Sequence, residues 1–158
     1  MIHAAANTIG ENAMSKALYT AQAHVTGGRT DGHGRTSDGA LEVDLRLPKE
    51  LGGEGDGTNP EELFAVGYAA CFESALGTVA RRKKEETGDL AIDSKVMLVT
   101  TEERSFTVAV DLAVSLPAFS DPAKAVELVR AAHAVCPYSN ATRGNIEVTL
   151  SANGQPVD

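Results

Sequence analysis

Cys71 and Cys136 are the only thiols in the 158-residue chain, and they are the side chains best suited to nucleophilic or redox chemistry. They lie 136 − 71 = 65 positions apart without a CxxC pair, which excludes a thioredoxin-type motif and a zinc-ribbon spacing. Cys71 interrupts the apolar run AVGYAACF, and Cys136 ends a second helical stretch. A fold that joins them would make a redox pair. Otherwise both are packed core thiols, the commoner role of a cysteine in an apolar helix.

The place of each cysteine on its expected helix separates their chemistry. Cys71 lies some three turns into its helix, beyond the useful reach of the helix dipole, so a lowered thiol pKa requires a cation from elsewhere. Cys136 lies at a helix carboxyl end, where partial negative charge disfavours a thiolate. Cys71 is therefore the better first nucleophile, and Cys136 is a partner for its oxidised form.

Other chemistry-bearing residues give weaker signals. His133 and Cys136 share a helix face at a spacing of three, but a metal site needs three or four ligands, so we interpret His133 as a core histidine. The loop LGGEGDG lacks the GK[ST] of a phosphate loop and carries acidic residues that would repel phosphate. Arg29 and Glu61 each stand at a structural boundary, and the pattern alone does not pair them.

Composition restricts the class of protein. A net charge of −8 argues against sequence-independent binding to nucleic acid, which needs a surplus of lysine and arginine. No apolar stretch approaches the ~20 residues of a membrane span, and no signal peptide is visible, so we expect a cytoplasmic protein. The length predicts a single domain over 15–158, with 1–14 as a loose extension.

Apolar periodicity predicts the elements that position these residues. We expect a strand from Ala17 to about 26, a glycine-rich turn over 27–39, and a strand over 41–47. A helix should begin at Pro60, capped by Asn59 with Glu62 as in a capping box, be enclosed on all sides over 63–72, and end at RRKK. The remaining elements are strands near 91–101 and 105–116, a helix from Asp121-Pro122 to Pro137, and a last strand over 146–150. The order ββαββαβ favours an α+β fold of antiparallel sheet with packed helices.

Several ordered motifs resemble the organic hydroperoxide resistance (Ohr) proteins of the OsmC superfamily. The matching segments are ALYTA (17–21), TGGR (26–29), SDG (37–39), ELGG (50–53), TNPEELFAVGYAACF (58–72) and CPYSNATRGNI (136–146). They extend over most of the chain from about Ala17 to Leu150. The chain departs from the family in a longer turn after Arg29 and in the segment TTEERS (100–105).

The resemblance implies a thiol-dependent peroxidase of organic hydroperoxides, both alkyl and fatty-acid, and an intertwined homodimer with two active sites at the subunit interface. Cys71 corresponds to the peroxidatic cysteine and Cys136 to the resolving one, joined as a disulfide during turnover. Arg29 corresponds to the activating cation and Glu61 to its carboxylate partner. The implied reductant is dihydrolipoamide on a lipoylated protein, with no bound cofactor or metal. Two rivals remain: an OsmC-type peroxidase of different substrate breadth, and a non-catalytic thiol sensor or ligand-binding protein of the same fold.

Overall fold

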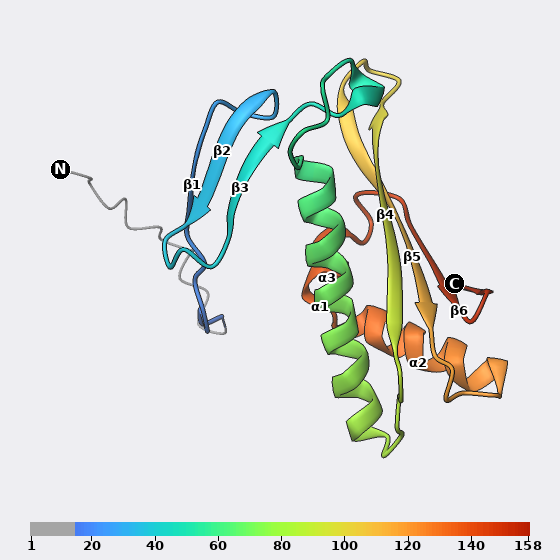
Figure 1. Cartoon of the computed structure of the whole chain (residues 1–158). Coiled ribbons are helices and arrows are strands. Elements are labelled where there is room, and N and C mark those ends of the chain that lie inside the picture. The colour runs from blue at the N-terminus through green and yellow to red at the C-terminus, as the bar shows by residue number, and fades with distance from the viewer. Residues whose placement is uncertain (1–14) are drawn as a thin grey trace.

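The computed structural model describes residues 15–158, so the predicted N-terminal extension over 1–14 lies outside the described residues. The described strands form two sheets, of order β1-β2-β3 and β4-β5-β6-β7. Figure 1 shows the first sheet standing to one side of helix α1, with the second sheet on the opposite side. The predicted α+β fold is confirmed, and of the three α-helices in the described residues α1 and α2 pack against the second sheet.

The first sheet is an antiparallel meander of β1 (Ala23–Thr26), β2 (Asp31–Thr36) and β3 (Glu42–Arg46). The prediction of a turn throughout 27–39 was wrong, because β2, of sequence DGHGRT, is a strand. Glycines within it hid the strand signal, since they carry no apolar side chain to alternate. A Cβ at Gly34 would lie in ordinary contact with Val25 and Val43 on the neighbouring strands, so the packing there does not itself require glycine.

Helix α1 (Pro60–Arg82) begins where the sequence predicted. The Asn59 side chain accepts a hydrogen bond from the Glu62 amide at 2.9 Å, whereas the Glu62 carboxylate accepts one from the Thr58 hydroxyl at 2.8 Å. Only half of the expected capping box is therefore formed. A short 3-10 helix, η1 (Lys49–Leu51), precedes the loop that leads into α1.

By length and composition α1 could cross a membrane, which corrects the expectation that no stretch approaches that size. One face of the helix instead contributes to the core, through the buried residues Tyr68, Phe72, Ala75, Leu76, Val79 and Ala80. The opposite face is not enclosed as predicted, since Val66 is 72% exposed. Both faces of α1 are thus apolar, but only one of them is packed against other elements of the same chain.

The second sheet contains β4 (Ala91–Thr100), β5 (Phe106–Ser115), β6 (Val148–Ala152) and β7 (Gln155–Val157). Strands β4 and β5 form a ten-residue antiparallel hairpin, and β6 and β7 a shorter one. The pair β5–β6 is parallel, because the chain crosses over through α2 (Pro122–Val135) and α3 (Pro137–Thr142) before returning to the sheet. The final strand β7 and helix α3 were not predicted.

Candidate active site

The fold brings the two thiols together. Cys71 on α1 and Cys136 at the end of α2 are free, and their sulfur atoms lie 3.8 Å apart. A disulfide has an S–S length of about 2.05 Å, so the sulfurs need to approach by a further ~1.7 Å. The arrangement can therefore pass from a dithiol to a disulfide with a small local movement.

Exposure distinguishes the two sulfurs. Cys136 is fully buried at 0% exposure, whereas Cys71 is partly exposed and lines a surface cavity of about 370 Å³. Burial raises the pKa of the Cys71 thiol above 9.0, the backbone N–H of Tyr138 lowers it, and the neighbouring Cys136 raises it further. A small molecule can thus reach Cys71 first, but the residues described around it do not by themselves favour a thiolate.

Cys136 occupies a junction rather than a simple helix end. It is the C-cap of α2 and also the N-cap of α3, with Pro137 at the first position of the new helix. The predicted end of the second helix is confirmed, but the negative end of α2 is followed at once by the positive end of α3. Helix position alone therefore does not make Cys136 the poorer nucleophile, and its complete burial becomes the distinguishing property.

A buried hydroxyl cluster fixes α3 on α1 beside the thiols. The Tyr68 hydroxyl lies 3.1 Å from the Ser139 hydroxyl and 2.9 Å from that of Thr142. The Tyr68 ring also packs against Tyr138, with centroids 5.6 Å apart, and Gly67 lets Tyr138 approach the helix closely. Sequence reasoning missed this cluster. The available signal was a tyrosine inside an apolar helix, since a buried tyrosine hydroxyl needs a partner.

Arg29 and Glu61 form the second group of the predicted site. The two guanidinium nitrogens of Arg29 donate to the two carboxylate oxygens of Glu61 at 3.1 and 2.9 Å. These hydrogen bonds raise the pKa of Arg29 and lower that of Glu61. The fork-to-fork geometry holds both charges and fixes the orientation of the guanidinium. The pairing that the family resemblance implied is thus present.

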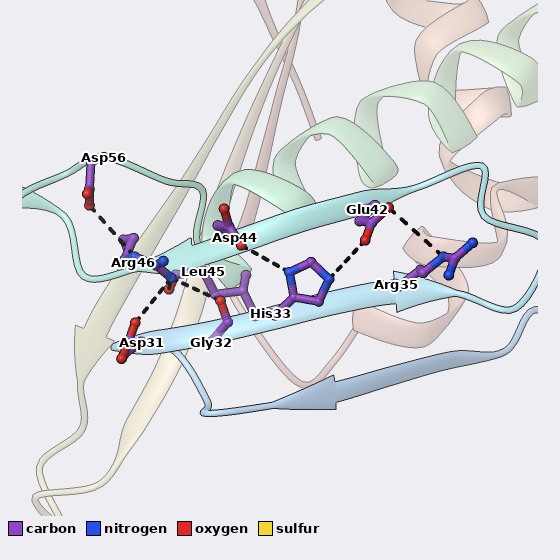
Figure 2. A network of polar contacts seen from close by, with 9 residues as sticks. All are labelled: Asp31, Gly32, His33, Arg35, Glu42, Asp44, Leu45, Arg46 and Asp56. Carbon is purple, nitrogen blue, oxygen red and sulfur yellow. Dashed lines mark hydrogen bonds and ion pairs between the residues drawn. The ribbon is translucent and has the colours of Figure 1, made fainter.

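The hairpin that carries Arg29 is held by polar contacts. Arg29 follows Gly27 and Gly28, whose φ angles of 75° and 63° allow the tight turn between β1 and β2. On the far side of the turn, Arg46 on β3 donates to the Gly32 carbonyl at 3.0 Å, as Figure 2 shows. The loop before α1 is held nearby, because Arg46 also lies 3.9 Å from Asp56. Arg46 therefore links the start of β2 to the segment that precedes Glu61.

A second polar clamp joins β2 to β3. The two ring nitrogens of His33 lie 3.0 Å from an Asp44 oxygen and 3.1 Å from a Glu42 oxygen (Figure 2). These carboxylates raise the pKa of His33 above 6.5, with the Asp44 hydrogen bond as the largest contribution. All three side chains are at least half exposed. The clamp is therefore a surface contact that depends on protonation of His33.

The two groups lie at different places along α1. Cys71 comes 71 − 61 = 10 residues after Glu61, a rise of ~15 Å along an α-helix. Arg29 and Glu61 line a cavity of about 500 Å³ walled by apolar side chains of Phe64, Leu98, Phe106, Val108 and Ile146, and Cys71 does not line it. The cation that the sequence argument required for Cys71 is therefore not supplied by Arg29 within the same chain. The candidate residues of one chain therefore form two groups. We call Cys71 and Cys136 the thiol half-site, and Arg29 and Glu61 the ion-pair half-site.

His133 packs against the ring of Phe72, with centroids 6.5 Å apart, which agrees with its interpretation as a core histidine. Burial and the nearby Arg143 lower its pKa below 6.5, and its Nδ1 has no hydrogen-bond partner among the described residues. Within 15–158, no three His, Cys, Asp or Glu side chains are grouped as a metal site would require. A cavity of about 990 Å³ on the β1–β2 face includes neither cysteine.

Comparisons with known proteins agree on one family. A sequence model of the OsmC-like protein family matches residues 53–151. The organic hydroperoxide resistance protein of Xanthomonas axonopodis pathovar citri is 51% identical over 138 residues, covering 86% of this chain and 95% of the relative.

Solved structures give the same result. A Legionella pneumophila structure described as an organic hydroperoxide resistance protein superposes with a TM-score of 0.81 at 51% identity, covering 86% of this chain and 98% of the other. A Vibrio cholerae structure of the same description, with captopril bound in one of its active sites, gives a TM-score of 0.84 at 42% identity and covers 90% and 96% of the two chains.

Proposed function

This chain belongs to the OsmC/Ohr superfamily, and from that premise we propose that it is a peroxidase that reduces organic hydroperoxides to alcohols with its own two thiols. The observation that carries the proposal is the 3.8 Å separation of a partly exposed Cys71 sulfur from a buried Cys136 sulfur. The names of the relatives, which are organic hydroperoxide resistance proteins, support the choice of substrate class. The separation of 65 positions between the two cysteines in the sequence does not by itself indicate that their sulfur atoms lie close together.

The proposed cycle has three steps. The Cys71 thiolate attacks the outer oxygen of the hydroperoxide, the O–O bond breaks, and the alkoxide takes a proton and leaves as the alcohol. Cys71 is then a sulfenic acid. The Cys136 sulfur attacks the Cys71 sulfur, water leaves, and a Cys71–Cys136 disulfide forms. An external dithiol reduces that disulfide and is itself oxidised to a cyclic disulfide, which restores both thiols.

A homodimer supplies what the single chain lacks. Large apolar side chains lie exposed on β1, α1 and β5, namely Val25 at 54%, Val66 at 72% and Phe106 at 68%. Exposure of this kind is typical of a surface covered by another protein. Since Arg29 lies ~15 Å along α1 from its own Cys71, we propose that the Arg29–Glu61 pair of one copy activates Cys71 of the other. The apolar cavity beside Arg29 would receive that thiol.

The Cys71–Cys136 disulfide of the proposed cycle requires an external electron donor. A lipoyl group carries two thiols on a long arm, so it can reduce a disulfide beneath a surface groove without the approach of a second protein active site. We propose dihydrolipoamide on a lipoylated protein as the electron donor, in the cytoplasm, with no bound cofactor.

The experiment is a turnover assay with cumene hydroperoxide and hydrogen peroxide, each with dihydrolipoamide and with thioredoxin as donor. We expect turnover with the organic peroxide and dihydrolipoamide, and a loss of at least about a thousandfold in Cys71→Ser, which removes the nucleophile. Substantial peroxidase activity in Cys71→Ser would overturn the proposal. Comparable turnover of hydrogen peroxide would instead favour the OsmC-type enzyme of different substrate breadth.

Cys136→Ala tests the second step. This variant should lose one Cys71 thiol for each peroxide added and stop at the sulfenic acid, which a dimedone adduct detects by mass spectrometry. Continued cycling at the wild-type rate would remove Cys136 from the mechanism. A non-catalytic ligand-binding protein would keep both thiols through a single addition of hydroperoxide.

A further inference from the structure

A groove leads from the Cys71 thiol along α1 to a second arginine. The cavity of about 370 Å³ is lined by Cys71, Ser74, Ala75, Thr78, Arg82, Val135 and Pro137, and we call it the thiol groove. The α1 positions 71, 75, 78 and 82 follow a spacing of four, three and four, so they share one face of the helix. The groove therefore runs parallel to the helix axis, with Cys71 at one end and Arg82 at the other.

The guanidinium end of the groove is available to a ligand. Arg82 is exposed and forms no ion pair with any residue of 15–158, and no acidic residue lines the groove. Its neighbour Arg81 differs, because it donates to the Thr78 hydroxyl at 3.2 Å and lines a different cavity. In a chain with a net charge of −8, Arg82 thus provides a local site for an anion.

The distance between Cys71 and Arg82 sets the length of a ligand that can contact both residues. Cys71 and Arg82 are 82 − 71 = 11 residues apart, a rise of ~16 Å along the helix. Because helical side chains lean toward the N-terminus, the guanidinium approaches the sulfur to roughly 10–16 Å. An extended alkyl chain on the order of ten carbons spans that distance. The walls between the two ends are small or apolar, with Ala75, Val135 and Pro137 among them.

We propose that Arg82 binds the carboxylate of a long-chain hydroperoxy acid whose peroxide lies at Cys71, so that the enzyme prefers free fatty-acid hydroperoxides to their neutral esters. This inference rests on the proposed peroxidase function, and it adds to the fatty-acid hydroperoxides that the family resemblance implies the residue that selects the free acid over the ester. Arg82 acts as a specificity residue in it and takes no part in breaking the O–O bond.

The test compares three hydroperoxides on the full-length protein, with dihydrolipoamide as donor. These are linoleic acid hydroperoxide below its micelle concentration, the methyl ester of the same compound, and cumene hydroperoxide. For wild type we expect a lower KM for the acid than for the ester. Arg82→Gln should raise the KM for the acid about tenfold, the effect of one lost charge-assisted hydrogen-bonded contact, and leave the ester and cumene hydroperoxide unchanged. Arg82→Lys should restore part of the preference.

Arg81→Gln is the matched control, because it removes the same charge one position away on a side chain that faces another cavity. An equal rise of the acid KM in Arg81→Gln and Arg82→Gln would overturn the inference, since only the overall charge would then matter. An acid-to-ester ratio near one in wild type would also overturn it. Both results would leave turnover of cumene hydroperoxide intact, whereas failure of the peroxidase proposal would abolish that turnover in wild type. Cumene turnover by each variant also reports that it is folded.

Discussion

The thiol half-site and the ion-pair half-site are built in opposite ways. The thiols lie where three helices meet, with Cys136 fully buried and Tyr68 fully buried beneath α3. Arg29 projects from a turn of a small sheet that shares no strand pairing with the main one, and its side chain is 38% exposed. Packing fixes the positions of the two thiols, whereas hydrogen bonds and ion pairs fix the position of the Arg29 guanidinium.

This difference follows from what each group needs. Close-packed side chains hold two neutral sulfurs at a defined separation, and no solvent is required. A guanidinium cannot be buried without a carboxylate, so its position is set by Glu61 and by the turn that carries it. The thiol half should therefore tolerate changes of charge and be sensitive to packing, and the cation half should show the reverse. Three experiments, ordered by expected effect, test this contrast.

The largest effect should come from separating the half-sites onto different chains. Arg29→Ala should slow oxidation of Cys71 by about 10²–10³-fold, because a fixed positive group beside the reacting charge is lost. A mixed dimer of one Arg29→Ala chain and one Cys71→Ser chain, isolated with two affinity tags, should recover about half of the wild-type activity, since one of its two symmetric sites is then complete. Stopped-flow measurement of peroxide consumption checks the rate.

The control for that experiment is the pair of parent homodimers, both of which should be nearly inactive. A mixed dimer as inactive as its parents would mean that Arg29 acts on Cys71 of its own chain, and the division into two half-sites would be wrong.

A smaller effect is expected from the buried hydroxyl cluster. Tyr68→Phe leaves the hydroxyls of Ser139 and Thr142 without their buried partner and should lower the free energy of unfolding by about 1–3 kcal/mol. Disulfide formation after oxidation should slow as well, because α3 and Cys136 are less firmly held. Urea denaturation and the rate of disulfide formation measure the two effects.

Tyr138→Phe is the matched change, since the Tyr138 ring is 38% exposed and its hydroxyl makes no hydrogen bond with a described residue. It should alter the unfolding free energy by at most a few tenths of a kcal/mol. A loss in Tyr68→Phe as small as that in Tyr138→Phe would show that ring packing, which both variants keep, holds α3 without the hydroxyl network.

The smallest effect should be a pH response confined to the hairpin. Asp44 and Glu42 raise the pKa of His33 above 6.5, so the clamp stabilises the folded hairpin fully below pH 6.5 and loses that contribution as the pH rises through the raised value. Amide hydrogen exchange in β2 and β3, corrected for intrinsic rates, should therefore increase slightly over that range. His33→Gln should remove the response, and a response of the same size in α1 would show that it does not belong to the hairpin.

The sequence predicted the main elements where apolar periodicity was unbroken. The strand over 105–116 and the helix capped by Asn59 both appear close to their predicted bounds, because their signals are local. Strand β2 was missed because Gly32 and Gly34 carry no side chains to alternate. Helix α3 was missed because Pro137 was interpreted only as the end of a helix, although proline also fits the first position of the next one.

For the candidate site as well, some features follow from the sequence and others only from the tertiary structure. The sequence by itself identified the candidate site residues, because the ordered motifs around Cys71, Cys136, Arg29 and Glu61 resemble one family along most of the chain. Only the tertiary structure decided which of them meet: it placed the two sulfurs 3.8 Å apart, paired Arg29 with Glu61, and kept the pairs at separate points of α1. Motifs record the residue types that a reaction needs, whereas distances between residues far apart in sequence arise from the packing of helices and sheets. The rise of ~15 Å along α1 between Glu61 and Cys71 is the basis of the proposal that the two pairs of one chain serve different active sites of a dimer.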